Sequence, residues 1–409
     1  MTAPASAITR AARLLGVDAA RGVALIGMMA VHVTPSIDPE GGVATAYVLA
    51  SGRASALFAV LAGVGLALAS GGSRPPRGRA LGGASAATAA RAAVLLLVGL
   101  AVGAPDSGVA VILVYYALLF VVAIPFLGLG PRVLLPLALC WAVLGPVISQ
   151  LLRGGRPWQS PGNPTFESLA DPGRLLTEVT LTGYYPVLPW TAYILLGLGL
   201  GRLDLRAART PLILLFSGAA LAVASRVTSW LLLETGGLDQ LREAGAAGHP
   251  VAGRPLELAL QTSFYGTTPT TSWWWLTVSA PHSAAPFDLL HTMGTSVAIL
   301  GLMLVLARPL GRVLWPLAAV GSMTLTLYSL HVVLLATALP RETPNALLWH
   351  VVVAFAIAVP WRHFVGRGPL EAVAARWAAI ARAAVDDRPN RASVELPPDE
   401  QQQADRHQP

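Results

Sequence analysis

Residues 16–33 read GVDAARGVALIGMMAVHV, an apolar run long enough to cross most of a bilayer as a helix. Three ionisable side chains interrupt the run: Asp18, Arg21 and His32. Together with Leu25 and Met28 they recur every three or four residues, so they share one helix face. From Asp18 to His32 a helix rises about 21 Å, at about 1.5 Å per residue. One face is therefore predicted to carry an ion pair near one end and an imidazole near the other.

Comparable hydropathy recurs along the whole chain. With residues 17–33 as the first, ten stretches are apolar enough to approach a bilayer span, the others being 46–70, 84–103, 108–127, 133–152, 184–201, 211–233, 287–307, 313–339 and 346–365. The third contains Arg91 and the sixth contains Pro186 and Pro189, which makes these two the weakest. The pattern predicts an all-α fold, a polytopic membrane bundle of about ten transmembrane helices.

Composition excludes several other classes of protein. Of the 409 residues, 54% are hydrophobic and only 12% are charged, with a mean hydropathy of +0.61. Soluble chains carry about 25% charged residues, so this chain cannot cover a soluble surface. A single cysteine, Cys140, excludes an intrachain disulfide. The net charge of +7 comes entirely from arginines scattered between apolar runs, which argues against a nucleic-acid partner.

The arginines also predict the topology. They gather before the first stretch and in alternate connections, at Arg10, Arg13, Arg74, Arg77, Arg79, Arg132, Arg202, Arg206, Arg209, Arg308, Arg312, Arg362 and Arg367. Arginine-rich short loops stay in the cytoplasm. Both termini are therefore predicted to be cytoplasmic, in a multi-pass protein of the cell membrane.

Two long connections then fall on the outer side, at about residues 153–183 and 234–286. Long loops in compact proteins are more often functional than idle. Residues 1–385 are expected to form one transmembrane domain. The polar segment 386–409 has no apolar period and is expected to be a disordered cytoplasmic tail.

Ionisable residues near the outer ends of the spans are candidate site residues, because such groups are costly at membrane depth. Arg53 and Arg226 each need a partner, and for Arg53 a structural salt bridge and an anion contact both remain open. Asp288 and His291 stand three residues apart, which makes a direct contact available. His32, His282 and His291 are all predicted on the outer side. Zinc could use three histidines, but no local ligand spacing supports a metal site.

Two further groups of polar or aromatic residues stand out. Trp274 lies in the run SWWWLT, which suits either an interfacial belt or a sugar-stacking platform. Tyr328 and His331 share a face of the ninth stretch, which suits either helix–helix hydrogen bonding or the lining of a cofactor tunnel.

The first stretch, through Asp18, Arg21–Gly22, Ala24 and His32, resembles the opening helix of the transmembrane acyltransferase superfamily. Further similar segments follow in order: SGRASALFAVLAGVGLAL, GYYPVLPWTAYILLGLGLGRLDL, APHSAAPFDLLHTMG, VGSMTLTLYSLH and RGPLE. They cover most of the chain, which looks most like the bacterial heparan-α-glucosaminide N-acetyltransferase-type branch, close to the YeiB-like family.

The resemblance implies transfer of an acyl group, usually acetyl from cytosolic acetyl-CoA, to an acceptor outside. No permanently bound cofactor is expected. His32 is the implied base or acyl acceptor and Arg53 the implied oxyanion donor, with Asp288 and His291 as further catalytic candidates. Donor binding is assigned to Asp18, Arg21, Arg91, Tyr328 and His331, and acceptor binding to Tyr185, Trp190, Arg226, Trp274 and His282. In the animal lysosomal enzyme an Asn matches His32, so the resemblance leaves N- and O-transfer both open.

Two other classes of function remain. Ten spans with intramembrane Arg and His would also suit a transporter or exporter of a small polar solute, with Pro186 and Pro189 breaking a helix at its site. A non-catalytic partner of a cell-envelope complex is the third class. Expected partners of the enzyme are membrane lipid and an extracytoplasmic glycan, lipid or metabolite, and a homodimer is left open.

Overall fold

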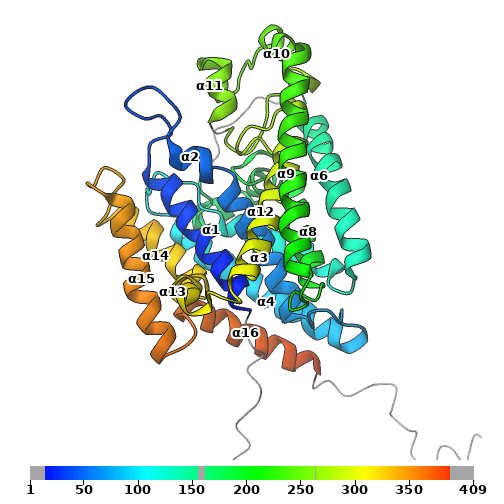
Figure 1. Ribbon diagram of the computed structural model, residues 1–409, viewed down its shortest axis with the longest axis vertical. Helices are drawn as coiled ribbons and strands as arrows, with labels where there is room; N and C mark the ends of the chain where they lie inside the picture. Colours follow the sequence, from blue (N-terminus) through cyan, green and yellow to red (C-terminus); the bar gives the residue numbers. More distant parts are fainter. Residues whose placement is uncertain (1–13, 155–161, 263, 387–409) are drawn as a thin grey trace, which may run out of the picture.

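The computed structural model describes residues 14–154, 162–262 and 264–386, and these residues form helices joined by loops, without a β-strand (Figure 1). The α-helices are α1 (Leu15–Val33), α2 (Thr45–Ala50), α3 (Arg53–Ala69), α4 (Gly78–Gly103), α5 (Leu113–Ala123), α6 (Pro131–Arg153), α7 (Pro172–Thr177), α8 (Val187–Gly201), α9 (Thr210–Leu232), α10 (Leu238–Ala244), α11 (Leu256–Gln261), α12 (Pro286–Leu306), α13 (Gly311–Gly321), α14 (Thr324–Ala336), α15 (Ala346–Phe364) and α16 (Pro369–Asp386).

Short 3₁₀ turns (η1 Ile124–Phe126, η2 Phe166–Ala170, η5 Pro250–Gly253 and η6 Trp273–Thr277) and π turns (η3 Glu178–Thr182 and η4 Leu233–Gly237) complete the described helical elements.

Seven of the described helical segments are long and apolar enough to cross a membrane. An eighth is the pair α13 and α14, which is bent by 63° and forms a broken span. Two shorter apolar helices, Leu113–Phe126 and Val187–Gly201, complete the set. Each of the ten stretches expected from hydropathy contains one of these elements. The predicted all-α membrane bundle is therefore confirmed, whereas the side on which the termini lie stays a prediction.

The helix boundaries differ from expectation at three places. Pro186 precedes α8 and Pro189 lies in its first turn, so these prolines begin a helix and do not break one. Helix α9 continues through η4 into α10, giving a helical segment that reaches Ala244 and shortens the loop expected at 234–286. Helix α16 was not expected at all. The predicted tail beyond Asp386 lies outside the described residues.

Helix α1 occupies the middle of the bundle, where it packs against α3, α12 and α13. Its crossing with α13 is very close: a Cβ on Gly22 would collide with the Leu317 carbonyl, and one on Gly321 with the Asp18 carbonyl. A second close crossing joins α3 and α8 through Gly63 and Gly197. These glycines let the backbones approach closely, which fixes the positions of α1 against α13 and of α3 against α8.

The two ends of the bundle differ in character. At the upper end of Figure 1, α10, α11 and the loops around them enclose a small apolar cluster centred on Phe264 and Trp275. At the lower end, α16 lies across the bundle and packs on α4. Helix α16 carries exposed Trp377 and Ile380 with one buried face, the pattern of an amphipathic surface helix.

Candidate active site

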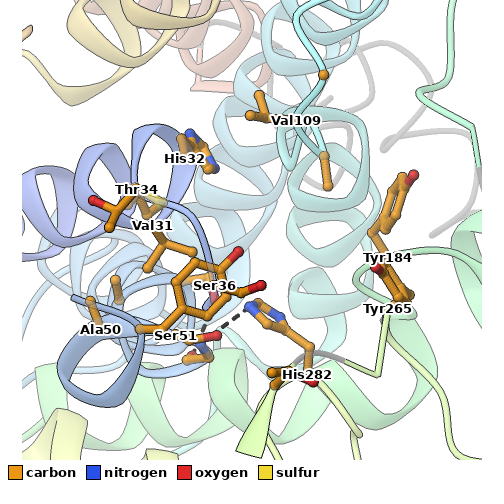
Figure 2. A pocket seen from close by; sticks show the side chains of 18 of the residues that line it. Val31, His32, Thr34, Ser36, Ala50, Ser51, Val109, Tyr184, Tyr265 and His282 are labelled. Carbon is orange, nitrogen blue, oxygen red and sulfur yellow. Dashed lines mark hydrogen bonds between the residues drawn. The ribbon is translucent and has the colours of Figure 1, made fainter. Parts of the chain in front are cut away.

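A cavity of about 700 Å³ opens between α1, α2, the start of α3 and the upper loops; we call it the His32 cavity (Figure 2). His32 enters it from the last turn of α1, and His282 enters from the loop before α12. Tyr185, just before α8, lines it as well. The structure therefore brings together three residues that the sequence places far apart, one catalytic and two acceptor-binding candidates.

His282 has a defined hydrogen-bonding state. The Gly52 N–H donates to Nε2 of His282 at 3.2 Å, so Nε2 is an acceptor and Nδ1 carries the proton of the neutral ring. Burial lowers the pKa of His282 to about 4, which keeps the ring neutral at physiological pH. Both residues have positive φ, 72° for Gly52 and 57° for His282. The ring of His282 lines the cavity, and its Nδ1–H is therefore a hydrogen-bond donor there.

His32 is joined to two other histidines. Its Nδ1 lies 3.1 Å from Nε2 of His331, and Nδ1 of His331 lies 3.0 Å from Nδ1 of His350. Of the two roles left open for His331, helix–helix hydrogen bonding is the one that the structure shows, since its ring on α14 contacts the candidate base on α1. His350, on α15, was missed by sequence reasoning because it is a lone imidazole in an apolar stretch. His331 could be found from the sequence because it shares a helix face with Tyr328, whereas no sequence pattern points to His350.

Several other polar residues of the His32 cavity were also missed. Arg254 donates to Thr262 and Tyr265, and Arg341 donates to the Gly108 carbonyl, so two exposed guanidinium groups lie on the cavity wall. Asn163 holds the segment that follows Gly108, accepting from the Val111 N–H at 2.8 Å and donating to the Val109 carbonyl at 2.7 Å. These residues lie in loops, where no periodicity indicates which side chains will meet. Their loop position was the only available signal.

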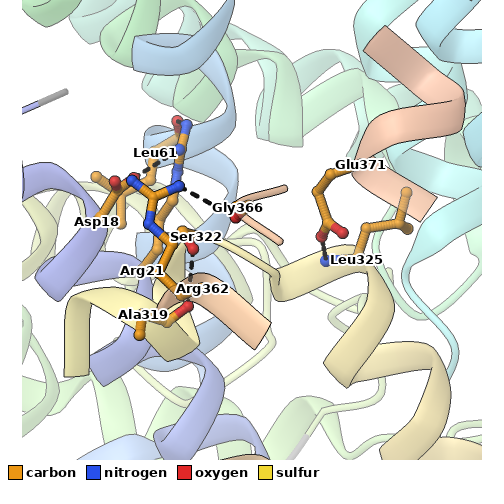
Figure 3. Close-up of polar contacts among 9 residues, drawn as sticks. All are labelled: Asp18, Arg21, Leu61, Ala319, Ser322, Leu325, Arg362, Gly366 and Glu371. Carbon is orange, nitrogen blue, oxygen red and sulfur yellow. Dashed lines mark hydrogen bonds and ion pairs between the residues drawn. The ribbon is translucent and has the colours of Figure 1, made fainter. Parts of the chain in front are cut away.

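A second cavity, of about 270 Å³, lies at the other end of α1; we call it the Arg21 cavity (Figure 3). Arg21 pairs with Asp18 at 3.3 Å and donates to the Leu61 carbonyl. Arg91, from α4, lines the same cavity. Two of the donor-binding candidates, Arg21 and Arg91, thus line one cavity, and Asp18 is the ion-pair partner of Arg21.

Glu371 completes the Arg21 cavity from α16 (Figure 3). Its carboxylate accepts hydrogen bonds from the N–H groups of Leu325 and Thr326, at 2.7 and 3.2 Å, and from the Thr326 hydroxyl at 2.6 Å. It therefore caps the first turn of α14, directly after the break in the bent span. The resemblance pointed to this glutamate through the RGPLE segment, without indicating what it contacts.

The linings of the two cavities contact each other. Tyr116 and Phe58 line the Arg21 cavity, and their rings stack at 5.4 Å. The Tyr116 hydroxyl donates to the carbonyl of Ser55 at 3.1 Å, and Ser55 lines the His32 cavity. Helix α3 thus faces the His32 cavity with Ser55 and, one turn later, the Arg21 cavity with Phe58. The Arg21 cavity and the His32 cavity therefore share a wall at Tyr116 and Ser55.

Arg53 and His291 lie elsewhere. Arg53 donates to Nε2 of His291 at 3.2 Å and to the Val48 carbonyl, and both residues line a separate groove of about 470 Å³ between α9 and α12. Arg226 lines that groove too and donates to the Ser279 carbonyl. The lining of the His32 cavity contains none of these three residues. The structure does not bring Arg53 to His32, because the side chain leaves the first turn of α3 toward α12.

The expected Asp288–His291 contact is replaced by other partners. Asp288 accepts from the Ala284 N–H at 3.1 Å, which ties its carboxylate to the turn that precedes α12. Nδ1 of His291 donates to the Ala222 carbonyl at 3.0 Å, since a carbonyl can only accept. Asp288 is therefore a buried residue of the helix start, and His291 belongs to the groove of Arg53.

Three aromatic candidates, Trp190, Tyr328 and Trp274, lie outside the His32 cavity. Trp190 is buried and packs edge-on against Tyr185, with ring centroids 5.0 Å apart. Tyr328 accepts from the Ile112 N–H at 3.2 Å and so holds the segment that forms a wall of the His32 cavity. Trp274 packs against the cluster of Trp275. The lining of the His32 cavity contains none of the three.

Metal coordination finds no support in the described residues, where no group of three or more His, Cys, Asp or Glu side chains could hold an ion. The three linked histidines are consistent with this, because their ring nitrogens pair with one another at about 3 Å. Their lone pairs do not converge on a common point.

These features define a multi-pass helical membrane protein with a histidine cluster beside the His32 cavity. The chain belongs to the family described as heparan-alpha-glucosaminide N-acetyltransferase, catalytic, whose sequence model matches residues 13–235. No curated protein matches the chain. The matched region contains His32, Arg21 and Arg91, whereas His282, His331 and His350 lie beyond it. The family is one of membrane acetyltransferases, which bears out the predicted class of enzyme.

Proposed function

We propose that the protein is a cell-membrane acyltransferase that moves an acetyl group from acetyl-CoA in the Arg21 cavity to an acceptor in the His32 cavity. The observation that carries this proposal is the wall that the two spaces share, where Tyr116 of one lining is hydrogen-bonded to Ser55 of the other. Between Arg21 and His32 the helix rises only about 16 Å, at about 1.5 Å per residue. A CoA molecule whose phosphates stay at Arg21 can therefore bring its thioester to His32 if the wall parts.

The Arg21 cavity suits the phosphates of the donor. Arg21 and Arg91 supply two guanidinium groups, and Arg382 of α16 donates to the Ala69 carbonyl beside them. Guanidinium groups form strong, often bidentate, hydrogen bonds with phosphate oxygens. This end carries the arginine-rich connections, which agrees with a donor that arrives from the cytoplasm.

The His32 cavity suits the acceptor. In the proposed reaction, Nε2 of His32 takes the proton of an amine or hydroxyl as that atom bonds to the thioester carbonyl carbon. The C–S bond then breaks, and the sulfur takes the proton from Nε2 to give the free CoA thiol. His282 would donate its Nδ1–H to the carbonyl oxygen as negative charge develops there. Burial raises the pKa of Tyr184 and of Tyr185, so both phenols on the cavity wall stay protonated donors.

Acetyl transfer by purified protein tests this proposal. Radiolabelled acetyl-CoA is offered with glucosamine as an amine acceptor, following the family's description, and with glucose as an acceptor that has only hydroxyl groups. Removal of a general base lowers rates by about 10²- to 10⁴-fold, so His32→Ala should lose transfer by about that factor. His363→Ala, an exposed histidine near the end of α15, is the matched control. Transfer by His32→Ala at the wild-type rate would contradict the mechanism.

The donor side is tested separately. Arg21→Gln should raise the KM for acetyl-CoA about tenfold or more, because one charged hydrogen-bonding partner of a phosphate is worth about 1.5–3 kcal/mol. Arg312→Gln removes the same charge from an exposed position at the start of α13 and should leave KM unchanged. An equal effect of the two changes would place the donor elsewhere.

Transport of a small polar solute is the second candidate, favoured by the 63° break between α13 and α14 beside the Arg21 cavity. Broken spans form solute sites in many transporters. Counterflow of a solute in proteoliposomes without acyl-CoA would support transport. Acetyl transfer with no such counterflow would support the enzyme.

A further inference from the structure

A chain of hydrogen bonds runs from the His32 cavity through three helices to a backbone carbonyl. His32 on α1 contacts His331 on α14, and His331 contacts His350 on α15. Nε2 of His350 then lies 3.0 Å from the carbonyl oxygen of Leu339. His331 and His350 are each only 1% exposed, so water does not compete for these bonds.

The carbonyl at the end of the chain fixes where every proton lies. A carbonyl oxygen can only accept, so Nε2 of His350 must be the N–H. Nδ1 of a neutral His350 is then an acceptor, which requires Nδ1 of His331 to donate. Nε2 of His331 is the next acceptor, and Nδ1 of His32 the next donor. The only pattern open to three neutral rings leaves a lone pair on Nε2 of His32.

The surroundings keep the three rings neutral. No ion pair in the described part of the chain joins a carboxylate to any of them, and a buried cation without a partner is costly. No hydrogen bond from a described residue reaches Nε2 of His32. Nε2 of His32, on a ring that lines the cavity, is thus unprotonated and accepts no hydrogen bond from the described residues.

We propose that His331 and His350 are positioning residues that hold His32 in the tautomer whose Nε2 receives the acceptor's proton. This inference rests on the proposed acetyl transfer, since it assigns His32 as the base. When Nε2 takes the proton, the imidazolium keeps its Nδ1–H on Nε2 of His331, which stabilises the positive charge until the proton passes to the thiolate of CoA. Neither His331 nor His350 lines the cavity, so neither touches the acceptor.

Kinetics of paired variants tests the inference. His331→Leu and His350→Leu each remove the hydrogen-bond acceptor of the preceding ring. Each should lower kcat about 10- to 100-fold, which is less than the loss expected when the base itself is removed. The KM for both substrates should stay within about twofold of the wild-type value. His331→Gln places a carbonyl oxygen near the former Nε2, and His350→Asn places one near the former Nδ1. Each should recover most of kcat. The exposed His363→Leu should behave as wild type.

The tautomer can be measured without activity. In protein labelled with ¹⁵N-histidine, the signals lost in His32→Ala identify His32, and its Nε2 should have the shift of an unprotonated ring nitrogen. In His331→Leu the His32 signals should move toward a mixture of tautomers, while His331→Gln should retain the wild-type pattern.

The two readouts separate the inference from the function beneath it. The predicted tautomer in a wild-type protein that transfers no acetyl would reject the proposed function and keep the hydrogen-bonded chain. Unchanged kcat in folded His331→Leu and His350→Leu, or a protonated Nε2 on His32 in the wild type, would overturn the positioning role. A folding defect alone cannot imitate the prediction, because the Gln and Asn variants must restore kcat at equal protein stability.

Discussion

His32 and His282 enter the same cavity in complementary hydrogen-bonding states. The Gly52 N–H occupies Nε2 of His282, which leaves that ring a donor, and the contact with His331 leaves His32 an acceptor. Acyl transfer needs both, one to remove a proton and one to stabilise an oxyanion. In the proposed transfer, the hydrogen-bonding partners of the two rings would therefore assign the base role to His32 and the donor role to His282.

The neutral state of His282 predicts an acid-sensitive fold. Its pKa falls from 6.5 to about 4 on burial, so its contribution to stability is complete above about pH 6.5 and is lost as the pH falls toward 4. At about 1.4 kcal/mol per pKa unit the loss is about 3 kcal/mol. His282→Gln, which keeps an acceptor for the Gly52 N–H but does not titrate, should show a smaller drop in Tm between about pH 7.5 and pH 4.5.

The matched control for this prediction is the exposed His363→Gln, which should lose as much Tm on acidification as the wild type. An equal acid-induced drop in His282→Gln and wild type would show that Nε2 of His282 can be protonated in the folded protein. The donor role assigned to that ring would then fail.

At the scale of elements, the crossing of α1 with α13 connects the Arg21 cavity with the chain of three histidines. Gly22 and Gly321 allow the two backbones to touch next to Asp18 and Arg21. The same α13 ends at the break whose far side, α14, carries His331. A change in this crossing therefore reaches both the guanidinium of the Arg21 cavity and the histidine chain.

Gly321→Ala should be strongly destabilising, because its Cβ has no space beside the Asp18 carbonyl. Overpacking of this kind costs about 1–3 kcal/mol or more, which should lower Tm and raise the KM for acetyl-CoA. Gly311→Ala, in the same helix, meets only a side-chain atom at 3.4 Å and serves as the control. Similar Tm values for the two variants would mean that α1 and α13 are not in close contact.

Hydropathy predicted the elements well and their bends poorly. All ten apolar stretches contain helices, because burial in lipid demands apolar side chains of a fixed length. The break at residues 322–323 has no proline and depends on Glu371, which caps α14 from a helix 45 residues further on. The extension of α9 into α10 passes through Gly236, a residue that favours a helix end on local grounds.

The candidate site shows the same limit. Helical spacing correctly predicted the ion pair of Asp18 with Arg21, because period is a local property. It could not show that Arg53 turns toward His291, or that His350 meets His331, because those contacts join helices far apart in sequence. Non-local packing, not local pattern, decided which polar residues share a cavity.

At the scale of the whole molecule, the two cavities open at opposite ends of the bundle. Cys140 is the only cysteine and is exposed, so Cys140→Ser gives a background for labelling. In intact cells, a membrane-impermeant maleimide should label Ala252→Cys, beside the His32 cavity, and should reach Arg312→Cys only after permeabilisation. The reverse pattern would place the arginine-rich end outside and contradict a cytoplasmic donor.

In the proposed reaction, the acetyl group enters from the Arg21 side of the membrane and leaves on the His32 side. Inside-out membrane vesicles with trapped glucosamine test it most directly when labelled acetyl-CoA, which cannot cross a bilayer, is added outside. Labelled N-acetylglucosamine should form inside wild-type vesicles, and none above background should form in His32→Ala vesicles. Product that forms only when donor and acceptor share one side, or that forms equally in His32→Ala vesicles, would contradict it.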